Sequence, residues 1–416
     1  MPRTARTRRT WRALRRVPAA LAALAAATGA APPDGAGPVP AAAGPVPAAA
    51  GWHVRPAAPA VRNQELRAVA ALDARTAWAV GNEDTGPGSV PLVERFDGRA
   101  WRRVTVPAAT GGLDAVLPLG PADVWAVGSR ADDPDDPPGP ADPADGDDPG
   151  GPGRGLALHF DGRAWREVPL PAEPAGRAAH PFALAADAAG LWAVGASAAD
   201  RTAQPRPLAL RWDGTAWRRA PLPGPGGDAV LLAAAPDRAG GLWAVGVAYD
   251  PDGTGRPLTL HRDGAGWHQV DAPSPAGRTS TLEAVAAFAP DDVWAAGGTG
   301  PSDDPARPFL LHWDGTRWQD AALPAGTGGV LHALAAADDG TLWAAGEQPA
   351  DATPGFTLRR RAGVWSHRSA DRTPAGDGAS LLAVAAVPGT GAAWAVGSTL
   401  PQQQDSWHPV IEAYRP

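Results

Sequence analysis

The sequence predicts an all-β fold, a seven-bladed β-propeller of four-stranded antiparallel blades that spans residues 51–416 and is closed by its N-terminal strand. Three observations support this prediction. The phrase Trp-Ala-(Val or Ala)-Gly returns seven times at intervals of about fifty residues, a period typical of propeller blades. Each interval holds four short apolar runs separated by turn residues. The last interval lacks its fourth run, and a matching run stands where the repetitive region begins.

The first 31 residues are typical of an export signal. Their arginine-rich start precedes an apolar run whose small residues suit cleavage near Ala30 or Ala31. The pair Arg8-Arg9, followed by a tryptophan, resembles a twin-arginine signal, and an arginine-rich general secretory signal is the alternative. The apolar run is shorter than the about 20 residues that a membrane helix needs. We therefore expect a secreted, extracellular protein with no membrane span in the mature chain.

Composition limits the structures and the partners that we expect for the rest of the chain. Residues 32–50 repeat proline and alanine, and we expect them to form an extended linker because they have no apolar face to bury. After residue 50 the abundant glycine and proline (51 and 48 in the whole chain) stand between regular apolar runs, so they indicate turns. A formal charge of −7 predicts no nucleic-acid partner, since such binding needs a basic face. The absence of cysteine excludes disulfides and thiol catalysis.

The phrase LLHWDGTRW predicts the outer hairpin of a blade. Asp314-Gly315 stands between two apolar runs, a pattern that favours a tight hairpin turn in which both residues take positive φ. Trp318 then begins the fourth strand, where its large flat side chain is expected to fill the wedge between neighbouring blades. In the second strand, Trp294 is expected to pack between sheets, and Gly297 to end the run where backbones crowd together.

The irregular units predict how the ring closes and where it varies. Residues 51–59 match the fourth-strand pattern and are expected to lie beside Val410–Tyr414, which would complete the seventh blade and hide the edges that an open sheet would expose. The sixth unit has lost its Asp-Gly pair, keeps only Trp365, and is predicted to be the weakest blade. An acidic insert, residues 131–154, is predicted to be a disordered, solvated loop, with weak cation binding as the alternative.

The phrases DVWAVG and WDGTxW resemble the repeats of secreted actinobacterial β-propeller proteins, within the broad kelch-like and Asp-box-like propeller group. The resemblance covers residues 51–416, almost the whole mature chain. It implies the propeller architecture and leaves the activity open, because propellers host lyases, sialidases, lectins and scaffolds alike.

Loop lengths predict which face of the ring carries function. In a meander, alternate connections lie on the same side, and here one set is tight whereas the other is long and variable. Ligand-binding residues usually occupy variable loops on a rigid scaffold. We therefore expect a ligand site on the long-loop face. Its candidate residues are Glu83, Arg130, His180, Tyr249, Asp250, Arg278 and Glu347.

Two patterns of potential metal ligands receive structural interpretations. His159, His261 and His312 each stand two positions before a turn aspartate, but equivalent positions of different blades are spread around the ring and cannot meet on one ion. The run DPDGTG, with Asp250 and Asp252, resembles a calcium loop but lacks the later acidic ligand. A plain turn is therefore favoured over a weak calcium site, and we expect no cofactor and no metal.

The function favoured is that of a non-catalytic secreted binding or scaffold module, a monomer that recognises a glycan or a protein through the long-loop face. Tyr249 and Trp407 are the candidate aromatic platforms for a glycan. The alternative is a propeller-type glycoside hydrolase or polysaccharide lyase with its site at the channel mouth, where Tyr249 and Glu283 would approach each other. The sequence has no Ser-His-Asp order, nucleophile elbow or phosphate loop, so binding is favoured over catalysis.

Overall fold

The computed structural model describes residues 51–58, 63–85, 88–107, 110–130, 154–174, 177–198, 204–224, 227–275, 277–300, 307–348, 355–370, 378–400 and 407–416. The predicted signal, the predicted linker and residues 131–153 of the insert lie outside the described residues. At the two ends of the insert, the backbone N–H of Arg130 donates to the carbonyl oxygen of Arg154 across 2.7 Å.

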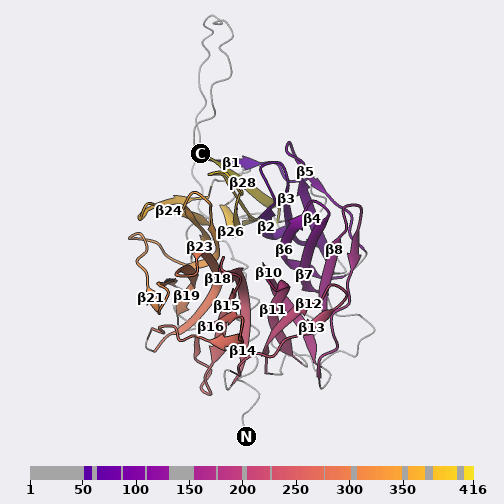
Figure 1. Ribbon diagram of the computed structural model, residues 1–416. Helices are drawn as coiled ribbons and strands as arrows, with labels where there is room; N and C mark the ends of the chain where they lie inside the picture. The colour runs from indigo at the N-terminus through magenta and orange to yellow at the C-terminus, as the bar shows by residue number, and fades with distance from the viewer. Residues whose placement is uncertain are drawn as a thin grey trace, which may run out of the picture.

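The described residues form 28 strands in seven four-stranded antiparallel sheets and no α-helix, which confirms the predicted fold class. It follows that none of these residues forms a helix able to cross a bilayer. The blades follow one another round a ring, as the colours of Figure 1 run from indigo to yellow. The first strands of neighbouring blades contact each other all the way round, so they surround the central axis.

Blades 1 to 3 comprise β2 (Gln64–Ala71), β3 (Ala77–Asp84), β4 (Ser89–Phe96) and β5 (Trp101–Arg103); β6 (Gly112–Gly120), β7 (Asp123–Ser129), β8 (Gly155–Phe160) and β9 (Trp165–Glu167); β10 (Ala178–Asp187), β11 (Gly190–Ala198), β12 (Arg206–Trp212) and β13 (Trp217–Arg219). Blades 4 to 6 comprise β14 (Ala229–Pro236), β15 (Leu242–Tyr249), β16 (Gly255–Asp263) and β17 (Gly266–Gln269); β18 (Thr279–Ala289), β19 (Asp292–Gly300), β20 (Arg307–Trp313) and β21 (Trp318–Asp320); β22 (Val330–Ala336), β23 (Leu342–Glu347), β24 (Phe356–Arg361) and β25 (Val364–Ser369). Blade 7 comprises β26 (Gly378–Ala386), β27 (Ala393–Leu400), β28 (Pro409–Arg415) and β1 (Gly51–Arg55).

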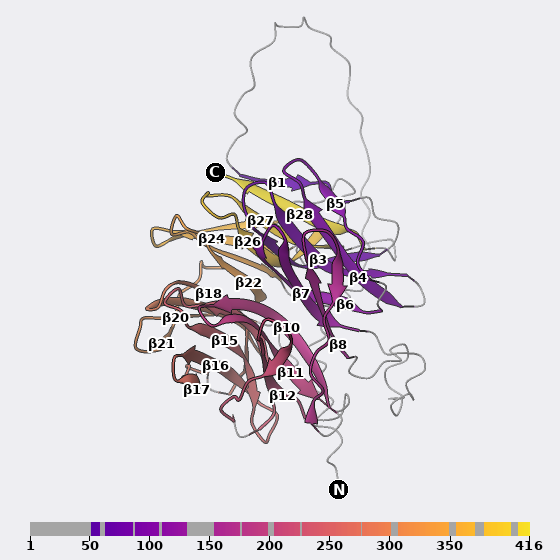
Figure 2. The ribbon, with the colours of Figure 1, turned by 45° about the vertical axis from the view of Figure 1, so that its right-hand side comes forward.

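The two ends of the repetitive region share blade 7. Strand β1 pairs antiparallel with β28, from Gly51 opposite Arg415 to Arg55 opposite Ile411. Both views place β1 beside β28 (Figures 1 and 2). The segment after β1 then reaches blade 1, where the backbone N–H of Ala58 donates to Glu94 Oε2 across 3.1 Å. Closure by the N-terminal strand is therefore as predicted, with β1 paired to the edge of β28 as the fourth strand of blade 7.

Tryptophan pairs fill six of the seven wedges between blades. In each, the second-strand Trp of one blade meets the fourth-strand Trp of the next blade edge-to-face, with ring centroids 5.1–5.7 Å apart and planes at 80–88°. This geometry is favourable for aromatic rings and adds to the apolar area that they bury. The predicted role of Trp318 is confirmed. The pairs are Trp343–Trp52, Trp78–Trp165, Trp394–Trp101, Trp125–Trp217, Trp192–Trp267 and Trp243–Trp318.

The wedge between blades 5 and 6 is built differently. The guanidinium of Arg360 lies over the ring of Trp294 at 4.7 Å. Trp365 is only partly buried, and its Nε1–H donates to the carbonyl oxygen of Ala322 across 3.1 Å. The sixth unit therefore differs from the others at the interface, which gives a physical reason for the prediction that it is the weakest blade.

The Asp-Gly pairs form turns by a different route from the one predicted. In blade 5 the turn has positive φ only at Gly315 (92°), and Asp314 Oδ1 accepts the backbone N–H groups of Thr316 and Arg317, each across 2.9 Å. The carboxylate thus holds a four-residue loop, as aspartate side chains commonly do in turns. The expectation of positive φ at both residues was wrong here. That geometry occurs instead at Ala362-Gly363 (49° and 80°), in the blade without Asp-Gly.

The repeat glycine is required by a β-bulge. The pairing of every first strand with its second strand shifts by one residue opposite this glycine. A Cβ placed on Gly297 would lie 2.0 Å from the carbonyl oxygen of Thr281, and the equivalent distances in the seven blades are 1.9–2.2 Å. The crowding predicted for Gly297 is therefore confirmed, and its cause is the inner strand of the same blade. The extra residue of each bulge is Arg67, Asp114, Phe182, Leu232, Glu283, His332 or Leu382.

Candidate functional site at the channel mouth

The seven bulge residues form a ring around the channel. They lie on the innermost strands, close to the end at which each strand leaves its long loop, so the ring lies toward the long-loop face. Neighbouring members touch: Arg67 Nη1 lies 3.0 Å from Asp114 Oδ1, and His332 Nδ1 lies 2.7 Å from Glu283 Oε2. Each of these contacts joins two blades. Bulges frequently redirect side chains next to functional sites, and here the same device recurs seven times.

One polar cluster joins blades 5, 6 and 7. His332 lies between two carboxylates, bonded to Glu283 and with Nε2 3.9 Å from Glu347 Oε1. Ser380 Oγ donates to Glu347 Oε2 across 2.5 Å. Burial alone would lower the pKa of His332, but the two carboxylates outweigh it and raise that pKa to about 10. For Glu347, burial likewise opposes ionisation, while His332 and Ser380 hold its pKa below the usual value. At neutral pH the cluster is therefore an imidazolium between two carboxylates.

A second polar cluster joins blades 1 and 2. Arg67 pairs with Glu65 across 2.8 Å and with Asp114 across 3.0 Å. Burial disfavours the charged guanidinium, yet the two carboxylates raise its pKa above the ordinary arginine value. This cluster repeats the charge pattern of the first, one cation between two carboxylates. Each cluster thus carries a net charge of −1 at the mouth.

Apolar bulge residues separate the two polar clusters. Phe182 and Leu232, from blades 3 and 4, lie between Asp114 and Glu283 in ring order, and Leu382 of blade 7 lies on the other side. All three are partly exposed. The mouth therefore alternates two acidic arcs with two apolar arcs, on a scaffold that is otherwise nearly repetitive.

Of the residues predicted from the sequence, Glu347 belongs to the His332 cluster. Three others form ion pairs elsewhere: Glu83 with Arg103, Arg130 with Glu167, and Asp250 with Arg256. The first two of these pairs join the second strand of a blade, or its end, to the fourth strand of the same blade.

The remaining predicted residues have different surroundings. Burial, with the charge of Asp228, raises the pKa of Tyr249 to about 12, so its hydroxyl stays protonated. His180 is 3% exposed on β10, beside the bulge of blade 3. Arg278 lies immediately before β18. Their roles in binding stay predictions.

The metal patterns of the sequence are explained by local contacts. The ring nitrogen Nε2 of each of His159, His261 and His312 lies 2.8–2.9 Å from an aspartate oxygen, and each ring lies against the second-strand Trp with centroids 4.3–4.5 Å apart. They stand in blades 2, 4 and 5. In the loop that resembles a calcium site, Arg256 pairs with Asp250, and Asp252 accepts the backbone N–H of Thr254 across 2.8 Å. The carboxylate of Asp250 is thus already paired with an arginine of the chain itself, which favours a plain turn over a calcium site.

Sequence reasoning missed the His332 cluster as a unit and the ring to which it belongs. The signal is present in the sequence. The seven first strands read LRAV, LDAV, PFAL, LLAA, LEAV, LHAL and LLAV, so one variable position stands between an apolar residue and an invariant alanine. That variable position is the bulge residue.

Comparison with known proteins locates the chain by fold. No model of a protein family matches it, and no curated protein does. Similar solved structures include YCF48 bound to D1 peptide, with 14% identity, coverage of 88% of this chain and 97% of the other, and a TM-score of 0.52. The WD40 β-propeller domain of Doa1 has 11% identity, coverage of 88% and 98%, and a TM-score of 0.54. The Hadza microbial sialidase Hz136 has 11% identity, coverage of 79% and 73%, and a TM-score of 0.51.

At these identities the likeness concerns the fold alone, and the proteins that share it include one with a bound peptide and an enzyme. The resemblance to actinobacterial repeat proteins stays a prediction from the sequence. By its own geometry and by these neighbours, the chain is a seven-bladed β-propeller.

Proposed function

We propose that the protein is a secreted binding module that holds an extended segment of another protein across the long-loop mouth of its channel. One observation carries the proposal: the bulge position varies in charge and size from blade to blade, whereas its neighbours in the sequence are nearly constant. A position needed only for packing would repeat as the flanking residues do. Variation at one ring around the channel, between nearly constant neighbours, is what a rigid scaffold with a recognition surface on its variable-loop face requires.

The chemistry of the mouth favours a segment that carries basic and apolar side chains. Two arcs of net negative charge attract cations, and Phe182, Leu232 and Leu382 offer apolar contact between them. A glycan would instead require exposed aromatic platforms. Of the two candidates, Tyr249 is largely enclosed and only Trp407 is well exposed, at 45%. The solved propeller with a bound peptide supports this choice by analogy of fold.

The protonation of the His332 cluster argues against general acid–base chemistry. A general base works best when its pKa lies near the working pH, and the pKa of His332 is about 10. Ser380 donates its hydroxyl hydrogen to Glu347, and His332 of the same cluster is protonated. The cluster therefore has no neutral histidine that could act as a base on Ser380. The hydrolase or lyase alternative would have to use other groups at the mouth.

A peptide-binding experiment tests the proposal. Arrays of peptides with basic and apolar residues would be screened against the purified chain, and hits measured by fluorescence polarisation. The variant Phe182→Ala should weaken binding at least about tenfold, because an apolar anchor at the centre of an interface contributes most of its energy. The control Val364→Ala, at a side chain 71% exposed on the outer hairpin of blade 6, should leave binding unchanged.

Two results would contradict the proposal. Equal binding by both variants would place the interface away from the mouth. Turnover of a glycoside or polysaccharide by the purified chain, lost on changing Glu283 to Gln, would establish the enzymatic alternative instead. The melting temperature of each variant would be measured in parallel, so that loss of binding is read only from folded protein.

A further inference from the structure

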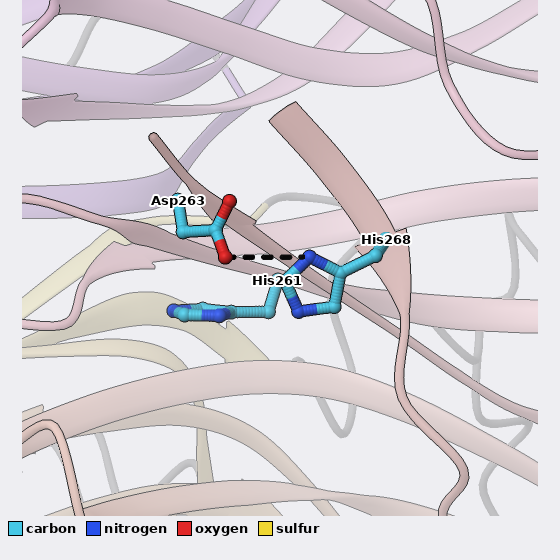
Figure 3. Close-up of side chains that lie close together, drawn as sticks. All are labelled: His261, Asp263 and His268. Carbon is cyan, nitrogen blue, oxygen red and sulfur yellow. Dashed lines mark ion pairs between the residues drawn. The ribbon is translucent and has the colours of Figure 1, made fainter. Parts of the chain in front are cut away.

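The outer hairpin of blade 4 brings two histidines and an aspartate together. His261 of β16 pairs directly with His268 of β17, and Asp263 ends β16 two residues after His261. One ligand atom from each residue lies within 4.8 Å of those of the other two, and Asp263 Oδ2 lies 3.9 Å from His268 Nδ1. Figure 3 shows Asp263 and His268 facing each other, with the His261 ring beside them. Among the described residues this is the one such group of three.

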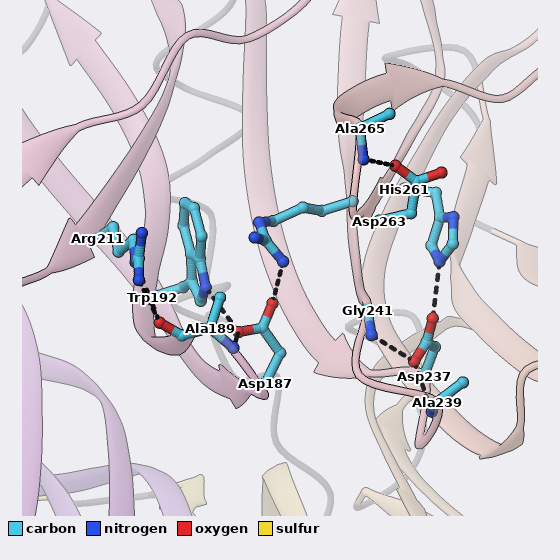
Figure 4. A network of polar contacts seen from close by, with 11 residues as sticks. Asp187, Ala189, Trp192, Arg211, Asp237, Ala239, Gly241, His261, Asp263 and Ala265 are labelled. Carbon is cyan, nitrogen blue, oxygen red and sulfur yellow. Dashed lines mark hydrogen bonds and ion pairs between the residues drawn. The ribbon is translucent and has the colours of Figure 1, made fainter.

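A buried carboxylate orients His261. Asp237 is 4% exposed and accepts hydrogen bonds from the backbone N–H groups of Ala239 and Gly241, each across 2.8 Å (Figure 4). Its second oxygen, Oδ2, lies 2.9 Å from Nε2 of His261. A carboxylate in this position can accept the Nε2–H of the ring and so fix its orientation. With Nε2 engaged by Asp237, Nδ1 is the ring nitrogen left for a metal ion, the carboxylate–histidine arrangement typical of metal ligands.

The charges around the hairpin suit a cation. Arg262, between His261 and Asp263, turns to the neighbouring blade and pairs with Asp187 Oδ2 across 2.5 Å. Its positive charge is thus neutralised away from the cluster. Asp263 Oδ1 accepts the backbone N–H of Ala265 across 2.8 Å, while Oδ2 faces His268.

We infer that this hairpin binds one divalent transition-metal ion of the Zn²⁺, Ni²⁺ or Cu²⁺ class through His261, Asp263 and His268. Two imidazole nitrogens and one carboxylate oxygen are a ligand set that these ions prefer, and water completes the coordination. Zinc–ligand bonds of about 2.0–2.1 Å require the three ligand atoms to approach to roughly 3.3 Å of one another. Asp263 and His268 can make this adjustment by side-chain rotation, because each side chain is 47% exposed. His261 is held by Asp237 and Trp243 and acts as the fixed ligand.

The protein contains its own comparison for this site. Blades 2 and 5 carry the same histidine and the same turn aspartate, but the residue opposite the histidine is Arg166 or Gln319. There the turn aspartates Asp161 and Asp314 pair with those two residues. If His268 had only a structural role, it would simply pair with its own turn aspartate, Asp263, as those two residues pair with theirs. Metal binding requires the second imidazole, which only blade 4 supplies among these three hairpins.

Titration of the untagged chain with ZnCl₂ by isothermal calorimetry tests the inference, with Co²⁺ absorption as a spectroscopic check of nitrogen ligation. We expect one ion per chain. His268→Gln should weaken binding at least about tenfold through the loss of one of three ligands, and it should fold normally because blade 5 uses glutamine at this position. The matched variant His159→Gln in blade 2 should bind Zn²⁺ as the unchanged chain does.

A converse variant sharpens the test. Gln319→His gives blade 5 the same three ligand types at the same spacing, so the number of ions bound should rise from one to two. Absence of Zn²⁺ binding by the unchanged chain would overturn the inference. Equal affinity in His268→Gln would also overturn it, because the ion would then lie elsewhere, for example in the acidic insert.

Discussion

The wedges between blades and the mouth of the channel follow opposite rules. Six wedges repeat the same Trp–Trp contact at nearly the same angle, whereas the seven bulge positions carry six different residue types. Ten of the twelve wedge tryptophans are buried, with Trp52 and Trp267 partly exposed, whereas all seven bulge residues are partly exposed. In a repeat protein, positions that hold neighbouring units together must repeat, while positions that meet a ligand are free to differ. The comparison therefore separates the residues that maintain the ring from those that define its surface.

The largest effect is expected from the repeat glycine, where the two regions meet. In Gly297→Val the new Cβ would overlap the carbonyl oxygen of Thr281, so the bulge and its strand pairing cannot both persist. We expect a loss of more than about 4 kcal/mol in the free energy of unfolding, or failure to fold. Chemical denaturation would measure it. Gly120→Ala is the control, because a Cβ there meets no atom within 4 Å, and an equal loss in both variants would refute the explanation.

The next effect compares a regular wedge with the irregular one. Trp318 is 4% exposed and contacts Trp243, whereas Trp365 is partly buried in the wedge without a Trp pair. We expect Trp318→Ala to cost about 3–5 kcal/mol, the range for a buried aromatic, and Trp365→Ala about 1–2 kcal/mol. Urea unfolding of both variants would measure the two losses in the free energy of unfolding. A larger loss for Trp365→Ala would mean that the sixth blade is held more firmly than its contacts indicate.

These two comparisons also explain how far the sequence predicts the structure. The Trp and Gly phrases repeat at blade spacing, so the ring, its closure by β1 and the wedge role of Trp318 follow from pattern alone. The contacts at the mouth do not follow from the pattern, because Arg67 and Asp114 are 47 residues apart and meet only after two blades pack. The Asp-Gly turns were misjudged for a local reason. The aspartate carboxylate supplies the hydrogen bonds that the prediction assigned to backbone conformation.

The His332 cluster links the mouth to stability through pH. The pKa of His332 is about 10, above its ordinary 6.5, because Glu283 and Glu347 favour the protonated ring. Its contribution is therefore complete below pH 6.5 and is lost as the pH rises through 10. We expect the unchanged chain to lose about 2–3 kcal/mol more than His332→Gln between pH 7 and pH 10 in denaturation experiments. Parallel curves for the two proteins would show that the carboxylates do not stabilise the imidazolium.

The smallest effect concerns the segment that closes the ring. Glu94, fully buried, bonds to the N–H of Ala58, and burial outweighs this bond and Arg103 to raise the pKa of Glu94 to about 7. Stability should fall as the pH rises from 4.5 to 7, because the unfolded chain releases this proton first. Glu94→Gln should therefore be about 1–2 kcal/mol more stable than the unchanged chain at pH 8.

The equivalent glutamate of blade 7 provides the control for that change. Glu412 is also fully buried, but it pairs with Arg368 Nη1 across 2.7 Å. Glu412→Gln removes a charge that has a partner and leaves the guanidinium without its carboxylate, so it should destabilise the protein at the same pH. Melting temperatures at pH 5 and pH 8 would compare the two. If both substitutions destabilise at pH 8, the carboxylate of Glu94 binds the closing segment as an ion, and burial does not govern its protonation.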